Sequence, residues 1–112
     1  MGLAAALAAT GRTGEAFQEY QRIERHWSGF PWAYIRRGEL LETSGQERAA
    51  LREYRAAADL DHGDANTYFV LGFAFLRHEK QDEAIAQFQA GLALQPDQEG
   101  PRKALERLLQ QQ

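Results

Sequence analysis

The segment that decides the fold, residues 65–98, reads ANTYFVLGFAFLRHEKQDEAIAQFQAGLALQPDQ. It holds two amphipathic helical patterns that are separated by a polar break. In the first pattern, Tyr68, Leu71 and Phe75 recur at the spacing of one helix face. Gly72 interrupts this pattern, and a glycine inside a helix costs about 1 kcal/mol relative to alanine. Gly72 therefore predicts a close helix crossing, at which any side chain would collide.

The second pattern places a small residue and an aromatic residue four positions apart, Ala84 and Phe88, and Pro96 ends it. A small-residue crossing, this pair and a closing proline form the pattern of a helix-turn-helix repeat of about 34 residues. On these residues the segment resembles a tetratricopeptide repeat. The positions that match the signature of that repeat are Tyr68, Leu71, Gly72, Phe75, Ala84, Phe88 and Pro96, and Gly91 stands where the family usually has alanine.

Self-similarity at a fixed period supports this interpretation. A shift of about 34 residues towards the N-terminus keeps nearly every packing position in its class. The aligned pairs are Tyr68 and Tyr34, Gly72 and Gly38, Phe75 and Leu41, Ala84 and Ala50, Phe88 and Tyr54, Gly91 and Ala57, and Leu94 and Leu60. The pattern departs where Leu71 aligns with Arg37 and Pro96 with His62. In the forward direction the shift reaches a last helix, in which Glu106 replaces the glycine. A carboxylate at this point predicts that no further helix docks there.

The resemblance implies an all-α fold, in which antiparallel helix-turn-helix repeats stack in a right-handed superhelix. We expect a single domain over residues 1–112. It would comprise a partial first repeat (1–30), a second repeat (31–64), a third repeat (65–98) and a C-terminal capping helix (99–112). Periodicity and capping signals predict helices over residues 2–10, 14–26, 31–43, 46–60, 65–77 and 81–94, and a last one from about 101 towards 111.

The composition restricts the class of protein. The chain has 112 residues, of which 44% are hydrophobic and 26% charged, as is ordinary for a folded globular domain. Its formal net charge of -3 argues against nucleic acid as a partner, because that would call for a concentrated basic surface. The chain contains no cysteine, which fits a reducing compartment, and we expect a cytoplasmic location. No stretch approaches the roughly 20 apolar residues of a membrane span, so we expect no membrane insertion.

Motifs that carry chemistry are missing from the sequence. There is no phosphate-binding glycine loop, no His-x-x-x-His pair on a helix and no Gly-x-Ser-x-Gly turn. The three histidines, His26, His62 and His78, are separated by whole repeats and fall at predicted helix ends or turns. This spacing does not favour a shared metal site. We therefore expect a protein that is not an enzyme and that uses no cofactor and no metal.

A second apolar stripe lies on the helix predicted over residues 65–77. Phe69, Phe73 and Leu76 recur at helical spacing on a face next to the core stripe, and a helix that is apolar nearly all round is normally buried nearly all round. The resemblance places this helix in the inner layer of the repeats, where the second face looks into a concave peptide-binding groove. The groove residues expected on this basis are Trp32, Ile35, Glu39, Phe69, Phe73 and Leu76, with Arg36, Arg77, Lys103 and Arg107 on or near the margin.

Three interpretations of this face stay open, and we favour the first, a non-enzymatic interaction adaptor. The groove would dock a partner protein or peptide, either an amphipathic helix or an extended segment with apolar anchors and acidic flanks. Alternatively, the same surface joins two copies in a homodimer or continues a longer repeat array. In the third interpretation, Phe69, Phe73 and Trp32 pack with each other and the last helix as ordinary core.

One ligand class of the family is not expected. Family members that bind chaperone tails hold a C-terminal carboxylate with Lys and Asn side chains on the inner helices. In this chain Ile35, Glu39, Phe69 and Phe73 stand at groove positions where those polar side chains would be needed.

Overall fold

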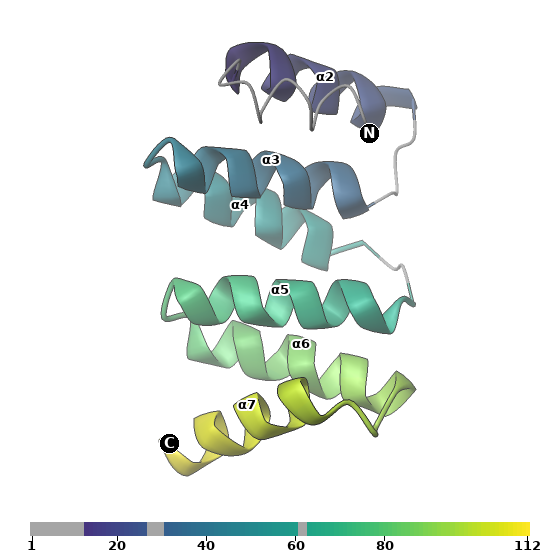
Figure 1. Cartoon of the computed structure of the whole chain (residues 1–112), viewed down its shortest axis with the longest axis vertical. Coiled ribbons are helices and arrows are strands. Elements are labelled where there is room, and N and C mark those ends of the chain that lie inside the picture. The colour runs from purple at the N-terminus through teal and green to yellow at the C-terminus, as the bar shows by residue number, and fades with distance from the viewer. Residues whose placement is uncertain (1–12, 27–30, 61–62) are drawn as a thin grey trace. The chain divides into compact units, whose positions relative to one another are not determined.

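The computed structural model describes residues 13–26, 31–60 and 63–112, and within these ranges the chain is all-α (Figure 1). The helices are α2 (Thr13–His26), α3 (Pro31–Thr43), α4 (Glu47–Ala58), α5 (Ala65–Arg77), α6 (Gln81–Leu94) and α7 (Glu99–Gln110). The bounds of α3, α5 and α6 are those expected from the sequence. Helix α4 is slightly shorter at both ends, and α7 begins before Pro101. The helix expected over residues 2–10 lies outside the described residues.

The contacts divide the chain into two compact units, which we call the N-terminal unit (residues 1–61) and the C-terminal unit (residues 62–112). In the N-terminal unit, α3 packs against α2 and α4; in the C-terminal unit, α6 packs against α5 and α7. The pairs α3–α4 and α5–α6 are antiparallel hairpins (Figure 1). The all-α hairpin architecture expected from the sequence is therefore confirmed, whereas the bounds assigned to the individual repeats stay a prediction.

The two hairpins turn in the same way. Gly45 and Glu79, which align at the repeat spacing, both adopt a left-handed backbone conformation, with φ of 79° and 60°. In each turn the next backbone amide donates to the carbonyl five residues before it, at 2.8 Å to Leu41 and 2.9 Å to Phe75. This Schellman arrangement satisfies carbonyls at the helix end and reverses the chain. Glycine adopts such a conformation freely, whereas Glu79 pays about 1 kcal/mol for it.

The start of α5 is capped by Asp64, which its position directly before the helix predicts from the sequence. Asp64 has an extended backbone, and its Oδ1 accepts a hydrogen bond from the backbone N–H of Asn66 at 3.3 Å. Its Oδ2 accepts a second one from the hydroxyl of Thr67 at 2.7 Å. The side chain thus satisfies a backbone donor that the helix itself leaves unpaired.

Each hairpin is held at one point by a glycine under an aromatic ring. A Cβ atom added to Gly72 would lie 2.6 Å from Cε1 of Phe88, and one added to Gly38 would lie 2.6 Å from Cε1 of Tyr54. Both rings are fully buried. The close crossing predicted at Gly72 is confirmed, and it recurs in the other hairpin. Any larger residue would push the two helices apart.

A further glycine explains how the α5–α6 hairpin differs from α3–α4. A Cβ atom on Gly91 would lie 2.5 Å from Cε1 of Phe69, so the phenylalanine ring rests on the glycine backbone. The residues that align with this pair in the other hairpin are Ile35 and Ala57. A larger residue on one helix is therefore matched by a smaller one on the other, which keeps the packed volume similar.

A buried ion pair marks the N-terminal unit. Arg37 is buried, and its Nη2 and Nε both donate to Oε2 of Glu53, at 2.7 and 3.1 Å. The guanidinium also lies over the rings of Tyr34, 4.8 Å from the centroid, and Phe17, 5.9 Å from the centroid. Because Phe17 belongs to α2, this one cation joins α2, α3 and α4.

The C-terminal unit lacks the equivalent pair. The aligned residues are Leu71, which is buried, and Gln87. The side-chain Oε1 of Gln87 is buried and has no hydrogen-bond partner among the described residues. An unsatisfied buried acceptor lowers stability, because it has lost its hydrogen bonds to water.

The contact between α2 and α3 is a small apolar cluster of Ala16, Tyr20 and Leu40, with Phe17 packed against it. Burial raises the pKa of the Tyr20 phenol above its ordinary value. Helical spacing in the sequence predicts three inward positions on this helix, Ala16, Tyr20 and Ile23. The first two are buried, as predicted, and the side chain of Ile23 lies outside the described part of the structure.

Helix α7 buries one side only. Helical spacing in the sequence predicts that Leu105, Leu108 and Leu109 face the stack. Leu108 is buried, as expected, and Leu105 is half-buried. Leu109, which was also expected to face inward, is 48% exposed, so that prediction was wrong. Leu109 aligns with Phe75, which is buried in the α5–α6 hairpin. In contrast, no helix follows α7 among the described residues to form a hairpin with it. Glu106 is exposed, as its charge requires.

The Phe69–Gly91 contact predicts a size exchange between the two helices. We expect Gly91→Ala to lower the free energy of unfolding by about 1 to 3 kcal/mol through overpacking, although alanine favours the helix by about 1 kcal/mol. The double variant Phe69→Ile, Gly91→Ala should regain most of the loss, because it recreates the Ile–Ala pair. Urea unfolding followed by circular dichroism measures all three proteins. Gly100→Ala is the matched control, since no atom lies within 4 Å of the added methyl group; a Gly91→Ala protein as stable as that control would contradict the contact.

Equivalent substitutions in the two hairpins should change stability in opposite directions. Glu53→Met leaves the buried Arg37 charge without its carboxylate and should cost about 3 kcal/mol. Gln87→Met removes an unsatisfied buried oxygen and should raise the free energy of unfolding by about 1 kcal/mol. Thermal and urea unfolding of both variants measure the effect. A destabilised Gln87→Met protein would mean that the amide has a partner after all.

Candidate functional site

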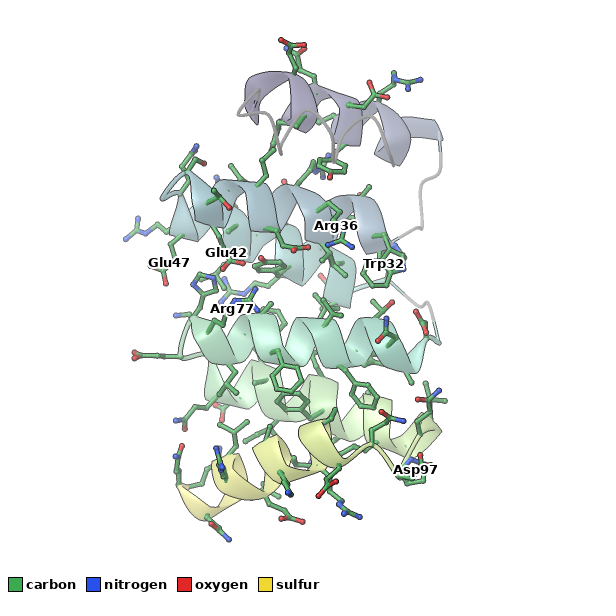
Figure 2. All side chains as sticks on the ribbon, viewed as in Figure 1. Trp32, Arg36, Glu42, Glu47, Arg77 and Asp97 are labelled. Atoms are coloured by element: carbon green, nitrogen blue, oxygen red, sulfur yellow. The ribbon has the colours of Figure 1, made fainter. Side chains whose placement is uncertain are left out.

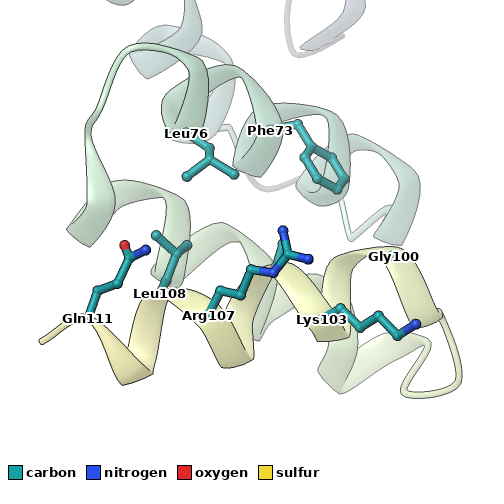
Figure 3. A pocket seen from close by; sticks show the side chains of 8 residues that line it. Phe73, Leu76, Gly100, Lys103, Arg107, Leu108 and Gln111 are labelled. Carbon is teal, nitrogen blue, oxygen red and sulfur yellow. The ribbon is translucent and has the colours of Figure 1, made fainter.

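A groove between α5 and α7 is the site in the C-terminal unit that best suits a ligand. It encloses about 510 Å³, which is within the range of small-ligand and peptide side-chain pockets. Figure 3 shows side chains from both helices facing this space. The lining residues are Phe73, Leu76, Gly100, Lys103, Ala104, Arg107, Leu108 and Gln111.

The floor of this groove is apolar and supported from below. Phe73 is 37% exposed, and its ring packs edge-on against the buried ring of Phe88, with centroids 4.9 Å apart and planes at 75°. Leu76 lies one helical turn further along α5 and is half-buried. Leu108 completes the floor from α7 and is itself buried. The edge-on contact fixes the Phe73 ring, so the surface it offers is formed before any ligand arrives.

The margin on α7 is basic. Lys103 and Arg107 are four residues apart and lie on the same face of the helix (Figure 3). Lys103 Nζ lies 2.9 Å from Glu99 Oε1, and both side chains are largely exposed, so this pair contributes at most about 1 kcal/mol. The side chain of Arg107 makes no hydrogen bond or ion pair within the described part of the chain.

Amide side chains hold the end of α7 against the start of α6. The Gln81 amide donates to Oε1 of Gln111 at 3.3 Å, and the Gln112 amide donates to Oδ1 of Asp82 at 3.2 Å. Gln111 also lines the groove. These two bonds therefore position the α7 wall at the end where Leu76 lies.

The structure brings four of the predicted site residues together: Phe73, Leu76, Lys103 and Arg107 all line the same groove. Arg77, the last residue of α5, is exposed and does not line it. Sequence reasoning missed the other four lining residues, which are Gly100, Ala104, Leu108 and Gln111. Their signal was available, because they recur at helical spacing with Lys103 and Arg107 on the last helix.

Two residues expected on the groove floor are buried instead. Ile35 has no exposed surface, and Phe69 is 7% exposed. For Phe69 the reason is the contact with Gly91, which turns the ring onto α6. Neither side chain offers surface to a ligand, and Phe69 matches the interpretation in which an aromatic stripe is ordinary core.

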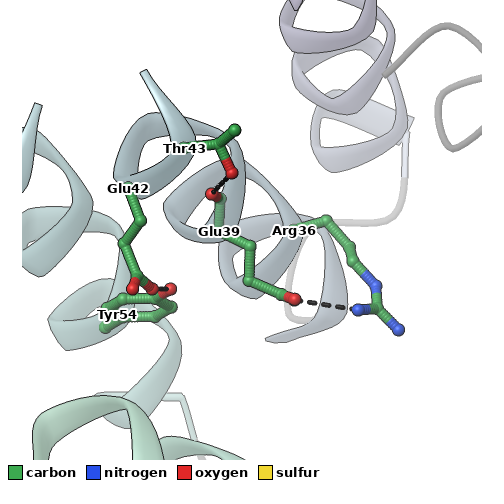
Figure 4. A network of polar contacts seen from close by, with 5 residues as sticks. All are labelled: Arg36, Glu39, Glu42, Thr43 and Tyr54. Carbon is green, nitrogen blue, oxygen red and sulfur yellow. Dashed lines mark hydrogen bonds and ion pairs between the residues drawn. The ribbon is translucent and has the colours of Figure 1, made fainter. Parts of the chain in front are cut away.

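The remaining predicted residues lie on α3, in the N-terminal unit, and form a polar surface. Trp32 is half-buried, and the Arg36 guanidinium lies 5.5 Å from its ring centroid. Arg36 Nη1 also donates to Glu39 Oε1 at 2.8 Å (Figure 4). Figure 2 shows Trp32 and Arg36 close together on α3. That these residues share a groove with α5 and α7 stays a prediction.

A second hollow, of about 420 Å³, lies in the N-terminal unit between α2, α3 and the turn after α3. Its polar lining is neutral: Gln18, Gln21, Ser44 and Gln46 provide amides and a hydroxyl, and no charged side chain takes part. This second hollow therefore lacks the cationic lining of the α5–α7 groove.

The described residues contain no cluster of three or more His, Cys, Asp or Glu side chains that could hold a metal ion. None of the described helices is both long enough and apolar enough to cross a membrane. The groove itself contains no carboxylate, histidine or hydroxyl side chain with which acid-base or nucleophilic chemistry could begin.

Solved structures of tetratricopeptide-repeat (TPR) domains are similar to this chain. The first TPR domain of Spaghetti (RPAP3), bound to the HSP90 peptide SRMEEVD, superposes with a TM-score of 0.73 at 18% identity, over 97% of this chain and 86% of that one. MamA gives a TM-score of 0.74 at 18% identity, over 99% of this chain and 65% of that one. The Yersinia enterocolitica type III secretion chaperone SycD, in complex with a peptide of the translocator YopD, gives 0.64 at 16% identity, over 97% and 83%. No protein-family model and no curated protein matches the sequence.

The exposure of Phe73 predicts that it contributes less to folding than its neighbour Phe75. We expect Phe73→Ala to cost about 1 to 2 kcal/mol and Phe75→Ala, in which a fully buried ring is lost, about 3 to 5 kcal/mol. Urea unfolding of the two variants measures both losses. Equal losses would show that Phe73 is core and that the groove floor is not a free surface.

Proposed function

We propose that this chain, which has the fold of a TPR domain, is a non-catalytic protein-interaction module that holds apolar side chains of a partner peptide between α5 and α7. The observation that carries the proposal is the groove itself. A partly exposed aromatic ring, fixed from below by a second ring, faces an open space with apolar side chains on both walls. Such a surface is typical of a preformed site for an apolar anchor.

The size of the groove suits side chains rather than a whole folded partner. One leucine or phenylalanine that is fully buried contributes about 1.5 to 3 kcal/mol. Two or three anchors contribute about 3 to 9 kcal/mol in total, and after the cost of ordering the peptide this corresponds to a dissociation constant on the order of millimolar to a tenth of that. We therefore expect reversible binding of a short segment.

The structural neighbours support this class of function. One of them is a complex with an HSP90 peptide, and another is a complex with a peptide of YopD. At 18% and 16% identity, these likenesses bear on the fold. The exposed part of α3, with Trp32, Arg36 and Glu39, belongs to the proposal as further surface that a longer partner would contact.

Self-association through the same surface is the rival function. Three large hydrophobic side chains of the C-terminal unit are exposed, namely Phe73, Leu94 and Leu109. If a second copy covered the groove, the solution mass would rise with concentration and Phe73→Glu would return it to that of a monomer. We expect a monomer at all concentrations.

The direct test is selection of binders from a library of dodecapeptides with amidated C-termini, with affinities measured by fluorescence polarisation. We expect peptides with two or three large apolar residues, and Phe73→Glu should weaken them at least about tenfold, because it places a charge at the anchor site. Leu94→Glu is the matched control, since it adds the same charge at an exposed leucine that does not line the groove. Circular dichroism confirms that both variants are folded. Peptides that bind equally well to both variants, or the absence of any binder, would overturn the proposal.

A further inference from the structure

We infer that the hollow between α2, α3 and the turn after α3, which we call the α2–α3 hollow, is a second docking site. It takes an uncharged partner segment, in which one large apolar side chain stands between neutral polar ones. The α2–α3 hollow belongs to the N-terminal unit and shares no residue with the α5–α7 groove. This second site therefore goes beyond the proposed function and does not depend on it.

The α2–α3 hollow combines an apolar floor with unused hydrogen-bonding groups. Leu40 and Leu41 of α3 are buried there, and Phe17 of α2 is half-buried. Gln18 and Gln21 are one helical turn apart on α2, and both are exposed. Neither of these side chains makes a hydrogen bond within the described part of the chain. Each carboxamide therefore has both donors and an acceptor available for a ligand.

The turn after α3 fixes the other side of the hollow. The hydroxyl of Ser44 donates to the carbonyl oxygens of Leu40 and Leu41, at 3.2 Å to each. The same hydroxyl accepts a hydrogen bond from the side-chain amide of Gln46 at 3.3 Å. These bonds hold the Gln46 carboxamide against the end of α3, so this part of the lining is in place before a ligand binds.

The neutrality of the lining is particular to this position in the chain. No charged side chain lines the hollow, although 26% of the residues are charged. One repeat later, five of the lining positions are occupied by basic residues instead. The aligned pairs are Gly14 and Arg48, Gln18 and Arg52, Gln21 and Arg55, Ser44 and His78, and Gln46 and Lys80. Because the fold accepts basic side chains at these positions, helix geometry alone does not require a neutral lining.

A neutral lining disfavours a ligand of either charge. A carboxylate or an ammonium group that enters the hollow loses water and finds no opposite charge there. A neutral amide or hydroxyl instead keeps its hydrogen bonds, because the carboxamides of Gln18 and Gln21 can both donate and accept. The chemistry that fits is therefore that of Asn, Gln, Ser and Thr side chains beside an apolar one.

The dimensions of the hollow suit a chain segment. Its volume of about 420 Å³ holds a large apolar side chain together with its neighbours. At one end of the lining stands Gly14, and a Cβ atom added there would have no atom within 4 Å. The hollow is thus open where α2 begins, so a partner segment can continue beyond it.

Peptides selected on the Phe73→Glu protein test this site, because that change places a charge in the α5–α7 groove and leaves the α2–α3 hollow unaltered. The probe is a library of dodecapeptides that are acetylated and amidated, so that neither end is charged. We expect binders with a large apolar residue, whose neighbours are enriched in Asn, Gln, Ser and Thr and depleted in all charged residues relative to the unselected library.

Charge substitutions in the best peptide separate a neutral site from a general field effect. Replacing one neutral neighbour of the apolar residue by Glu and, separately, by Lys should each weaken binding about fivefold or more, measured by fluorescence polarisation. A field effect would instead weaken one of these peptides and strengthen the other.

The protein variant is Gln21→Arg, made in the Phe73→Glu protein, which introduces the residue found at the aligned position of α4. It removes an acceptor and adds a charge, so we expect the neutral peptide to bind about fivefold or more weakly. The peptide that carries Glu should then bind better than the neutral one. The matched control is Gln89→Arg, the same substitution at the aligned exposed position of α6, outside the hollow. Circular dichroism confirms that both variants are folded.

Three results would each overturn the assignment of the α2–α3 hollow: no binder on the Phe73→Glu protein, binders that tolerate Glu or Lys beside the apolar residue, or equal effects of Gln21→Arg and Gln89→Arg. None of them bears on the proposed function, which concerns peptides that Phe73→Glu weakens and Gln21→Arg leaves unchanged. If only that class of peptide is missing, the proposed function fails and the α2–α3 hollow keeps its assignment.

Discussion

The structure depends on the close approach of an aromatic ring to a glycine backbone, once in each hairpin. Tyr54 lies on Gly38 and Phe88 lies on Gly72, at distances that leave no room for a Cβ atom. This contact sets the separation of the two helices, and the rest of each hairpin is built around it. Because the constraint is steric, it requires one residue type at one position. It is therefore the feature of the fold that is easiest to recognise in a sequence.

Near this common contact, a hydrogen-bonded pair in the α3–α4 hairpin is replaced by an apolar pair in the α5–α6 hairpin. The Tyr54 hydroxyl donates to Glu42 Oε1, as Figure 4 shows, whereas the aligned residues Phe88 and Leu76 can form no such bond. Glu42 is therefore bound to its own hairpin, but Leu76 lines the groove. The change that removes the internal hydrogen bond is the same change that makes the floor apolar. The α3–α4 and α5–α6 hairpins thus share a backbone structure but present different side chains at their surfaces.

Most of the fold could be predicted from the sequence, whereas the burial of the second apolar stripe could not, for a physical reason. Helical periodicity and the 34-residue alignment predict the helices, the crossing glycines and the Asp64 cap, because these are local or steric requirements. The second stripe of α5 was harder, since a helix that is apolar nearly all round does not reveal which apolar face is covered. The residue that indicates which apolar face of α5 is covered is Gly91. A glycine in place of alanine implies a large opposing side chain, and that side chain is Phe69.

The groove gains its character from what α7 carries at the positions of the preceding inner helices. Lys103 aligns with Phe69 and Ile35, and Arg107 aligns with Phe73 and Glu39. In α5 the first of these positions is buried against the neighbouring helix, whereas in α7 it holds an exposed cation. The α5 side of the groove is apolar and the α7 side carries both cations, so the surface has an apolar floor and a cationic margin. Helix α7 supplies the cations and part of the apolar floor, and α5 supplies the partly exposed aromatic ring, so the surface comes from the pairing of the two helices in one unit.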